Sequence, residues 1–254
     1  MKRFIVKNKN AGDKKAFEII KKQVLQKPES LIGLAAGKTI DGLYKLISND
    51  VIKYTNLWKK IKVFQIDENL GISPDSEFSF NHQLKKKLKP LLKKLSPKNI
   101  FLIDGTENPK KIIKKAYEFL CQNKEMDLVI LGIGPEHDPH IAYNTTGRSS
   151  LNSKMRVVEL HPKILKKLVR ALPTRGEARS QSERHATPQR GITLGIKDIL
   201  KSKKVLLIAY GKEKAKSIKL AFKGKVDTKR ASASALKLHN NLEIVLDKDA
   251  GKYL

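Results

Sequence analysis

The side chains best suited to acid–base chemistry include two adjacent carboxylates, Asp67 and Glu68, which directly follow the largely apolar run Val63–Ile66. A carboxylate that a buried strand carries to the edge of a sheet can remove a proton from a carbon atom beside a carbonyl group. A carboxylate in this position can equally cap a helix or a turn by accepting hydrogen bonds from free backbone amides. The local sequence therefore leaves Asp67 as either a general base or a cap.

A second group of ionisable side chains lies between Gly132 and Asn144, where a buried run ends in glycines and two histidines and two carboxylates follow. His140 has Asp138 two positions before it, and a histidine oriented by a carboxylate can transfer protons near neutral pH. Histidines mixed with carboxylates can also bind a metal ion, but no third ligand with suitable spacing stands out. The pattern favours proton transfer over a metal site.

The segment Gly33–Thr39 (GLAAGKT) consists mostly of small residues and joins an apolar run to a helical pattern. Gly37, followed by Lys38, would let the backbone approach an anion. Thr39 could cap the next helix, whose free amides and positive dipole end would then face that anion. The spacing differs by one residue from that of a Walker loop. A phosphate-binding loop and a plain tight turn both fit this segment.

Two cationic side chains stand next to predicted strands. Arg156 begins one strand, and Lys214 follows Gly211 by three residues after another. Guanidinium and ammonium groups both bind phosphate, so each of these residues could hold an anionic ligand. Either one taken alone could also be an ordinary surface charge.

The elements predicted around these residues explain how they could meet. Short β-branched runs alternate with longer amphipathic stretches, which predicts a doubly wound, mostly parallel, Rossmann-like α/β sheet with helices on both faces. Ligands of such sheets bind at the carboxyl ends of the strands. We predict a single domain over residues 1–254, with the polar segment 173–189 as a lid or mobile loop. The predicted strands are Arg3–Lys7, Leu31–Ala35, Val63–Asp67, Asn99–Ile103, Asp127–Gly132, Arg156–Leu160, Val205–Tyr210 and Leu242–Asp247.

Helices are predicted between the strands. Asn108 followed by Pro109 is typical of a helix start, because asparagine caps free amides and proline suits the first helical position. Apolar residues at helical spacing predict further helices around residues 43–47 and 218–222.

Length and composition limit the class of protein. A chain of 254 residues with 40% hydrophobic residues can bury a sizeable core in one large domain. The single cysteine, Cys121, excludes an internal disulfide framework and suits a reducing compartment, and we expect it to pack in the core. No run of about 18 apolar residues could span a membrane, and the amino terminus lacks the apolar part of a signal peptide. We therefore expect a cytoplasmic protein.

The formal net charge of +28 comes mainly from lysines that are dispersed along the predicted helices. Such a field attracts any polyanion, but no recognition helix, zinc finger or RNA-binding platform accompanies it. The charge therefore predicts anionic ligands and salt-sensitive adhesion, with no specific nucleic-acid partner and no membrane partner.

Taken in order, seven motifs of this chain resemble those of the glucosamine-6-phosphate deaminase and 6-phosphogluconolactonase superfamily, from about residue 31 to the carboxyl terminus. The deaminase branch is the better fit, because HIAYN at residues 140–144 is similar to its H-I-A-F-N, where lactonases usually read H-T-A-S-L. The other similar segments are GLAAGKT (33–39), IDENLGI (66–72), SFNH (79–82), ITLGI (192–196), GKEKA (211–215) and ASALKLH (233–239).

The resemblance implies a sugar-phosphate substrate and the conversion of glucosamine 6-phosphate to fructose 6-phosphate and ammonia. It implies that the reaction needs neither an organic cofactor nor a metal ion, and family members are often homo-oligomers. The substrate phosphate would lie on the loop Gly37–Thr39 between Arg156 and Lys214. His140 would assist opening of the sugar ring with Asp138 beside it, and Asp67 would move a proton between carbons 2 and 1.

Two departures from the family pattern keep alternatives open. The segment Gly132–His140 is two residues longer than the family's G-x-G-x-D-G-H, so Glu136 competes with Asp138 for the catalytic position, although adjacency to His140 favours Asp138. Thr145 stands where deaminases carry a glutamate that tunes the histidine, and threonine cannot supply that charge. A 6-phosphogluconolactonase-like hydrolase and a sugar-phosphate-binding sensor impaired in turnover are the alternative functions.

Overall fold

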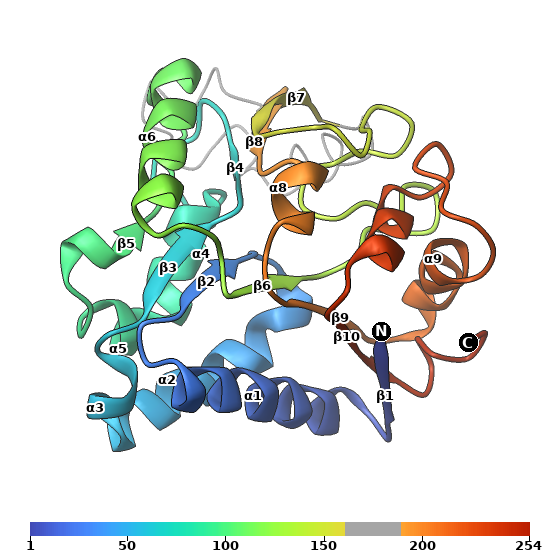
Figure 1. Cartoon of the computed structure of the whole chain (residues 1–254), viewed down its shortest axis with the longest axis horizontal. Coiled ribbons are helices and arrows are strands. Elements are labelled where there is room, and N and C mark those ends of the chain that lie inside the picture. Colours follow the sequence, from blue (N-terminus) through green and yellow to red (C-terminus); the bar gives the residue numbers. More distant parts are fainter. Residues whose placement is uncertain (161–188) are drawn as a thin grey trace, which may run out of the picture.

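The computed structural model describes residues 1–160 and 189–254, and it contains a central sheet in which every pair of neighbouring strands is parallel (Figure 1). The strand order is β1-β10-β9-β6-β2-β3-β5. The strands β2, β6 and β9 are buried at every residue, as expected when helices cover both faces of a sheet. The seven strands are β1 (Lys2–Val6), β2 (Leu31–Leu34), β3 (Lys62–Gln65), β5 (Ile100–Phe101), β6 (Leu128–Leu131), β9 (Val205–Ala209) and β10 (Leu242–Asp247).

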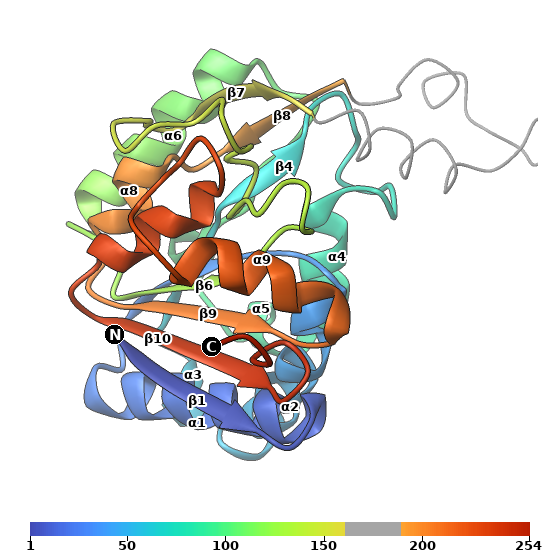
Figure 2. The same ribbon diagram turned by 90° about the vertical axis from the view of Figure 1, so that its right-hand side faces the viewer.

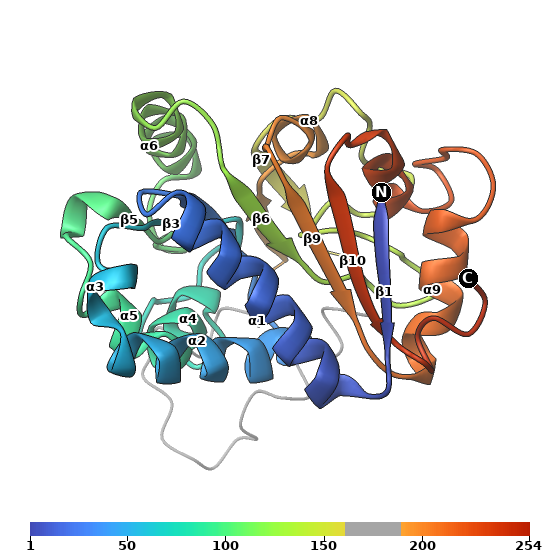
Figure 3. The same ribbon diagram turned by 60° about the horizontal axis from the view of Figure 1, so that its bottom comes forward.

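Helices lie on both faces of this sheet, with α1 and α2 below it and α6 and α8 above it in Figures 1 and 2. Figure 3 shows α1 crossing the sheet from the β1 edge, where it contacts β1, β10, β9 and α2. The helices are α1 (Lys9–Gln26), α2 (Asp41–Lys53), α3 (Thr55–Trp58), α4 (Phe80–Lys87), α5 (Lys89–Leu92), α6 (Pro109–Gln122), α8 (Ile196–Leu200) and α9 (Lys212–Phe222). Short 3₁₀ turns are η1 (Lys38–Ile40), η2 (Pro97–Asn99) and η4 (Ser232–Leu238).

The helix start predicted at Asn108 and Pro109 is confirmed. Asn108 accepts a hydrogen bond from the Lys110 amide, and α6 begins at Pro109. The apolar residues predicted to mark helices at 43–47 and 218–222 lie in α2 and α9. The doubly wound α/β architecture is therefore confirmed.

A second, smaller sheet was not predicted. It contains β4 (Asp67–Asn69), β8 (Arg190–Thr193) and β7 (Arg156–Glu159), which pair antiparallel in the order β4-β8-β7 on the α6 and α8 side of the central sheet (Figures 1 and 2). The prediction had placed residues 156–160 in the parallel sheet and had ended the third strand at Asp67. Both were wrong because three or four residues carry too little alternation to identify a strand or its partner.

The prediction for Cys121 was also wrong. This residue is exposed near the end of α6, because the buried stripe of that helix runs through Ile112 and Ala116 and Cys121 lies off that stripe. The predicted lid at 173–189 lies outside the described residues except for Gln189. No helix in the described part of the chain is both long and apolar enough to cross a membrane.

Candidate active site

The carboxyl ends of four neighbouring strands, in the order β9, β6, β2 and β3, carry most of the predicted site residues. Because parallel strands all end at the same edge of a sheet, these segments meet along one line. The chain runs outward from β2 through β3 to β5 and then returns to β6 on the other side of β2. The boundary between β2 and β6 is thus the point at which the winding direction switches, where α/β sheets bind ligands.

Asp67 lies just beyond β3, as the first residue of β4, and is buried. Its Oδ1 atom has no hydrogen-bond partner among the described residues. Burial, and then the negative charge of Glu68, raise the pKa of Asp67 to about 8. A carboxyl with a free oxygen and a pKa near 8 can both accept and return a proton close to neutral pH.

Glu68 takes the capping role, which the sequence had left open for this pair of carboxylates. It accepts hydrogen bonds from the backbone amides of Phe80 and Asn81 at 2.9 and 2.7 Å, in the first turn of α4. It also accepts one from Gln65 Nε2 at 3.0 Å. Glu68 therefore adds to the capping of α4, whose N-cap residue is Ser79, and Asp67 remains available for chemistry.

His140 is held by Asp138, whose Oδ2 lies 2.8 Å from His140 Nδ1. The Oδ1 atom of Asp138 accepts a hydrogen bond from the Thr146 amide at 2.8 Å. Although burial opposes ionisation, the hydrogen bonds from His140 and Thr146 lower the pKa of Asp138. Within the described ranges nothing binds Nε2 of His140, so this nitrogen is free to exchange a proton with a ligand.

The two-residue extension of the histidine loop does not disturb this pair. Glu136 is exposed and forms an ion pair with Lys216 at 3.1 Å, so Asp138 is the carboxylate beside His140. The loop closes through a hydrogen bond from the Gly134 amide to the His140 carbonyl, 2.8 Å long. A Cβ atom at Gly134 would lie 2.6 Å from His140 Nδ1, so only glycine leaves room for the ring.

The small sheet connects Asp67 to Arg156. Thr193 of β8 pairs with Asp67 on one side and with Arg156 on the other, and residues directly opposite in an antiparallel ladder project from the same face. The Thr193 hydroxyl also accepts a hydrogen bond from the Tyr143 amide at 3.0 Å, which attaches the histidine segment to the same row. Thr193 belongs to the segment ITLGI (192–196), but the sequence analysis assigned it no role, because its partners depend on strand register.

The two predicted cations contact opposite ends of the histidine segment. Lys214 Nζ donates a hydrogen bond to the Ile133 carbonyl at 2.7 Å, at the beginning of the loop. Arg156 donates to Asn144 Oδ1 at 3.0 Å, at its end, and to Ser149 Oγ at 2.7 Å. Both cations thereby contact the segment that carries His140.

The predicted phosphate loop differs from expectation at Thr39. Gly37 has a φ of +131°, a conformation that favours glycine, and Lys38 is exposed. Thr39 lies inside the turn η1, and among the described residues no side chain caps α2, which begins two residues later at Asp41. The capping role predicted for Thr39 is therefore wrong, because the inserted 3₁₀ turn moves the helix start beyond its reach.

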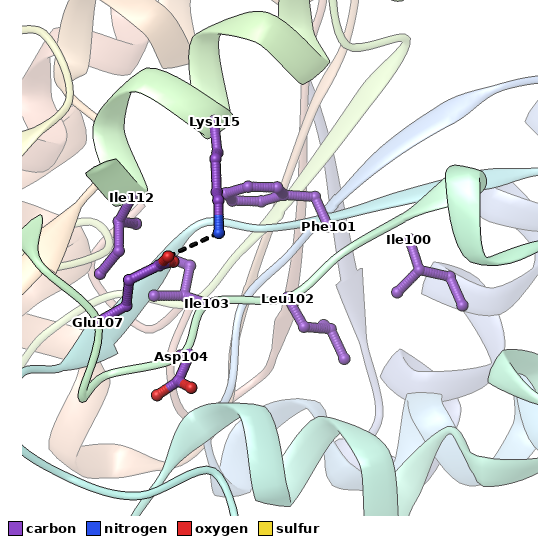
Figure 4. Close-up of a pocket in the computed structure, with 8 residues that line it drawn as sticks. All are labelled: Ile100, Phe101, Leu102, Ile103, Asp104, Glu107, Ile112 and Lys115. Atoms are coloured by element: carbon purple, nitrogen blue, oxygen red, sulfur yellow. Dashed lines mark hydrogen bonds and ion pairs between the residues drawn. The ribbon is translucent and has the colours of Figure 1, made fainter. Parts of the chain in front are cut away.

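A cavity of about 380 Å³ lies away from these residues, between the β5 segment and α6 (Figure 4). Its walls include Leu102 and Ile112, and Glu107 pairs with Lys115 there at 2.6 Å. None of the predicted site residues lines it. The remaining lining residues are Ile100, Phe101, Ile103 and Asp104.

Comparison with known proteins gives consistent results. The family described as glucosamine-6-phosphate isomerases/6-phosphogluconolactonase matches residues 9–163. The chain is 34% identical to the glucosamine-6-phosphate deaminase of Clostridium novyi (strain NT), over 100% of both proteins. It is 32% identical to the protein of the same name from Thermoanaerobacter sp. (strain X514), over 100% of this chain and 95% of the relative.

Solved structures show the same fold. A monomeric glucosamine-6-phosphate deaminase superposes with a TM-score of 0.86 at 25% identity, over 100% of both chains. The 6-phosphogluconolactonase from Trypanosoma brucei superposes with a TM-score of 0.74 at 16% identity, over 100% of this chain and 98% of the other.

Proposed function

The chain belongs to the glucosamine-6-phosphate isomerase/6-phosphogluconolactonase family, and on this premise we propose that it converts glucosamine 6-phosphate to fructose 6-phosphate and ammonia. The observation that carries the proposal is the pairing of two proton-transfer groups at one sheet edge. Asp67 has an unbonded oxygen and a pKa near 8, and His140 is oriented by Asp138. A reaction that needs a base at carbon 2 and a separate acid–base group for the sugar ring uses both.

The substrate phosphate would be bound by the amides of Gly37–Thr39 together with Arg156 and Lys214. These groups lie on segments that all reach the same edge of the central sheet or the small sheet beside it. Binding energy from a phosphate far from the reacting atoms orients carbons 1 and 2 without changing during the reaction.

The chemistry begins when His140 transfers a proton to open the pyranose ring. Asp67 then removes the proton from carbon 2 of the open-chain amino aldose and delivers it to carbon 1. This shift leaves a carbon–nitrogen double bond at carbon 2, and addition of water releases ammonia and the ketose phosphate. Asp138 keeps the His140 ring in the orientation that the first step requires.

The test is an assay of the purified chain with glucosamine 6-phosphate in which ammonia and fructose 6-phosphate are both measured. In deuterated water, the proton that Asp67 carries should exchange, so deuterium is expected at carbon 1 of the product. Folded protein that releases neither product would reject the proposal. Accelerated hydrolysis of 6-phosphogluconolactone would point to the hydrolase, and binding of sugar phosphates without turnover would point to the sensor.

A further inference from the structure

Lys9, the first residue of α1, contacts the predicted phosphate loop from 30 positions away in the sequence. Its Nζ atom donates a hydrogen bond to the Thr39 carbonyl oxygen at 3.0 Å and forms an ion pair with Asp13 at 2.7 Å. The same ammonium group lies 5.1 Å from the centre of the ring of Tyr210, the residue that follows β9 and precedes Gly211. One side chain thus joins α1, the loop after β2 and the end of β9.

The surroundings of Lys9 show that this contact is built into the packing. Asp13 is only 5% exposed, and its Oδ1 atom lacks a hydrogen-bond partner in the described part of the chain. The first turn of α2 packs directly on the pair, because a Cβ atom at Gly42 would lie 1.9 Å from Asp13 Oδ2 and 3.2 Å from Lys9 Nζ. The lysine is therefore held between two helices and the loop.

The bond to Thr39 has a defined effect on the loop. The Thr39 carbonyl and the Ile40 amide belong to one planar peptide unit, so holding the oxygen also orients the N–H group. That amide donates to the Gly37 carbonyl at 3.2 Å and so closes the turn.

We propose that Lys9 is a positioning residue of the phosphate site, which holds the Gly37–Thr39 turn in the shape that binds the phosphate group. The inference rests on the proposed function to the extent that this loop must be the phosphate site. Because the phosphate is bound equally in the ground state and the transition state, Lys9 contributes to KM and leaves kcat unchanged.

The experiment compares the wild-type chain with Lys9→Met and with the control Lys15→Met. Lys15 lies on the same helix, pairs with Glu18 at 3.1 Å and lies 4.9 Å from the centre of the Phe4 ring, so the control also loses one charge, one ion pair and one ring contact. Affinity for inorganic phosphate is measured by calorimetry, and kinetics with glucosamine 6-phosphate. For Lys9→Met we expect about tenfold weaker phosphate binding, the effect of losing one such hydrogen bond, and a matching rise in KM.

In the single variant, Asp13 loses the positive charge that neutralises it. A double variant, Lys9→Met with Asp13→Asn, removes this unpaired buried charge. It therefore separates the positioning of the loop by Lys9 from the neutralisation of Asp13 by Lys9, and it protects against unfolding of the single variant. The proposal expects the double variant to bind phosphate as weakly as Lys9→Met. Wild-type affinity in either variant would overturn it, as would an equal loss in Lys15→Met. Phosphate binding by a wild-type chain without turnover rejects the deaminase alone, whereas a wild-type chain that binds no phosphate rejects both proposals.

Discussion

At the scale of single residues, burial and a neighbouring charge act on the pKa of Asp67 in the same direction. Both raise its pKa, from the ordinary value of 3.8 to about 8. A carboxyl whose pKa is raised in the folded state stabilises the fold fully below the unfolded-state pKa, and this contribution is lost as the pH rises through the folded-state value. The stabilising contribution of Asp67 is therefore lost between about pH 4 and pH 8.

Replacement of Asp67 with asparagine should separate its effects on activity and on stability. We expect kcat to fall by about 10²- to 10⁴-fold, because the base is lost. We also expect the variant to gain stability relative to the wild type between pH 5 and pH 9, because it never holds a buried charge. Activity profiles and denaturant unfolding at both pH values measure this, with the exposed Asp75→Asn as control. A stability difference that is the same at both pH values would contradict the assignment.

At the scale of elements, β4 has two functions within three residues. Asp67 projects toward the site, while Glu68 anchors the first turn of α4 through the amides of Phe80 and Asn81. The anchor also affects chemistry, because the charge of Glu68 is one of the causes that raise the pKa of Asp67.

Glu68→Gln should therefore change stability and pH dependence together. We expect a loss of about 2–3 kcal/mol in the free energy of unfolding, because charge-assisted hydrogen bonds to a buried group are weakened. The pH at which kcat/KM rises should shift below about 8, because Asp67 would lose a repelling neighbour. If the rise of kcat/KM with pH does not shift in a variant that is destabilised but active, Glu68 acts on stability alone.

In the small sheet, Thr193 lies between Asp67 and Arg156 in one row, and its hydroxyl attaches the histidine segment to that row. Thr193→Val keeps the shape of the side chain but leaves the buried Tyr143 amide without its acceptor, which costs about 1–3 kcal/mol. We expect a lower melting temperature and a lower kcat, since the segment that carries His140 loses an attachment to the row. Thr193→Ser, which retains the hydroxyl group, should restore both. Failure of the serine variant to restore kcat would assign the effect to packing.

At the scale of the whole molecule, the net charge of +28 should act on any anion. Sugar-phosphate binding combines this field with directed hydrogen bonds, whereas binding of nucleic acid would depend on the field alone. We expect two unrelated DNA duplexes of equal length to bind equally well and to be released between about 0.05 and 0.5 M salt. Fluorescence anisotropy measures both. A preference between the duplexes that persists at high salt would indicate a specific nucleic-acid site.

Local pattern in the sequence was enough to predict the architecture, and it identified most of the candidate site segments as lying after strands, where the structure has them. Apolar runs buried on both faces identified the central strands, and Asn108 with Pro109 identified the start of α6. The acid and histidine after β6 were recognisable because a buried run ended in glycines. These features depend on residues close together in the chain, which is what periodicity and capping record.

Tertiary structure alone decided which residues work together. Three features join segments that lie far apart in the chain: the hydrogen bonds that Glu68 accepts from the first turn of α4, the row that joins Asp67 to Arg156 through Thr193, and the bond from Lys9 to the predicted phosphate loop. The local sequence does not encode such partners, because they depend on strand register and on how closely two helices approach. A shift of one residue in register would turn the whole row to the other face.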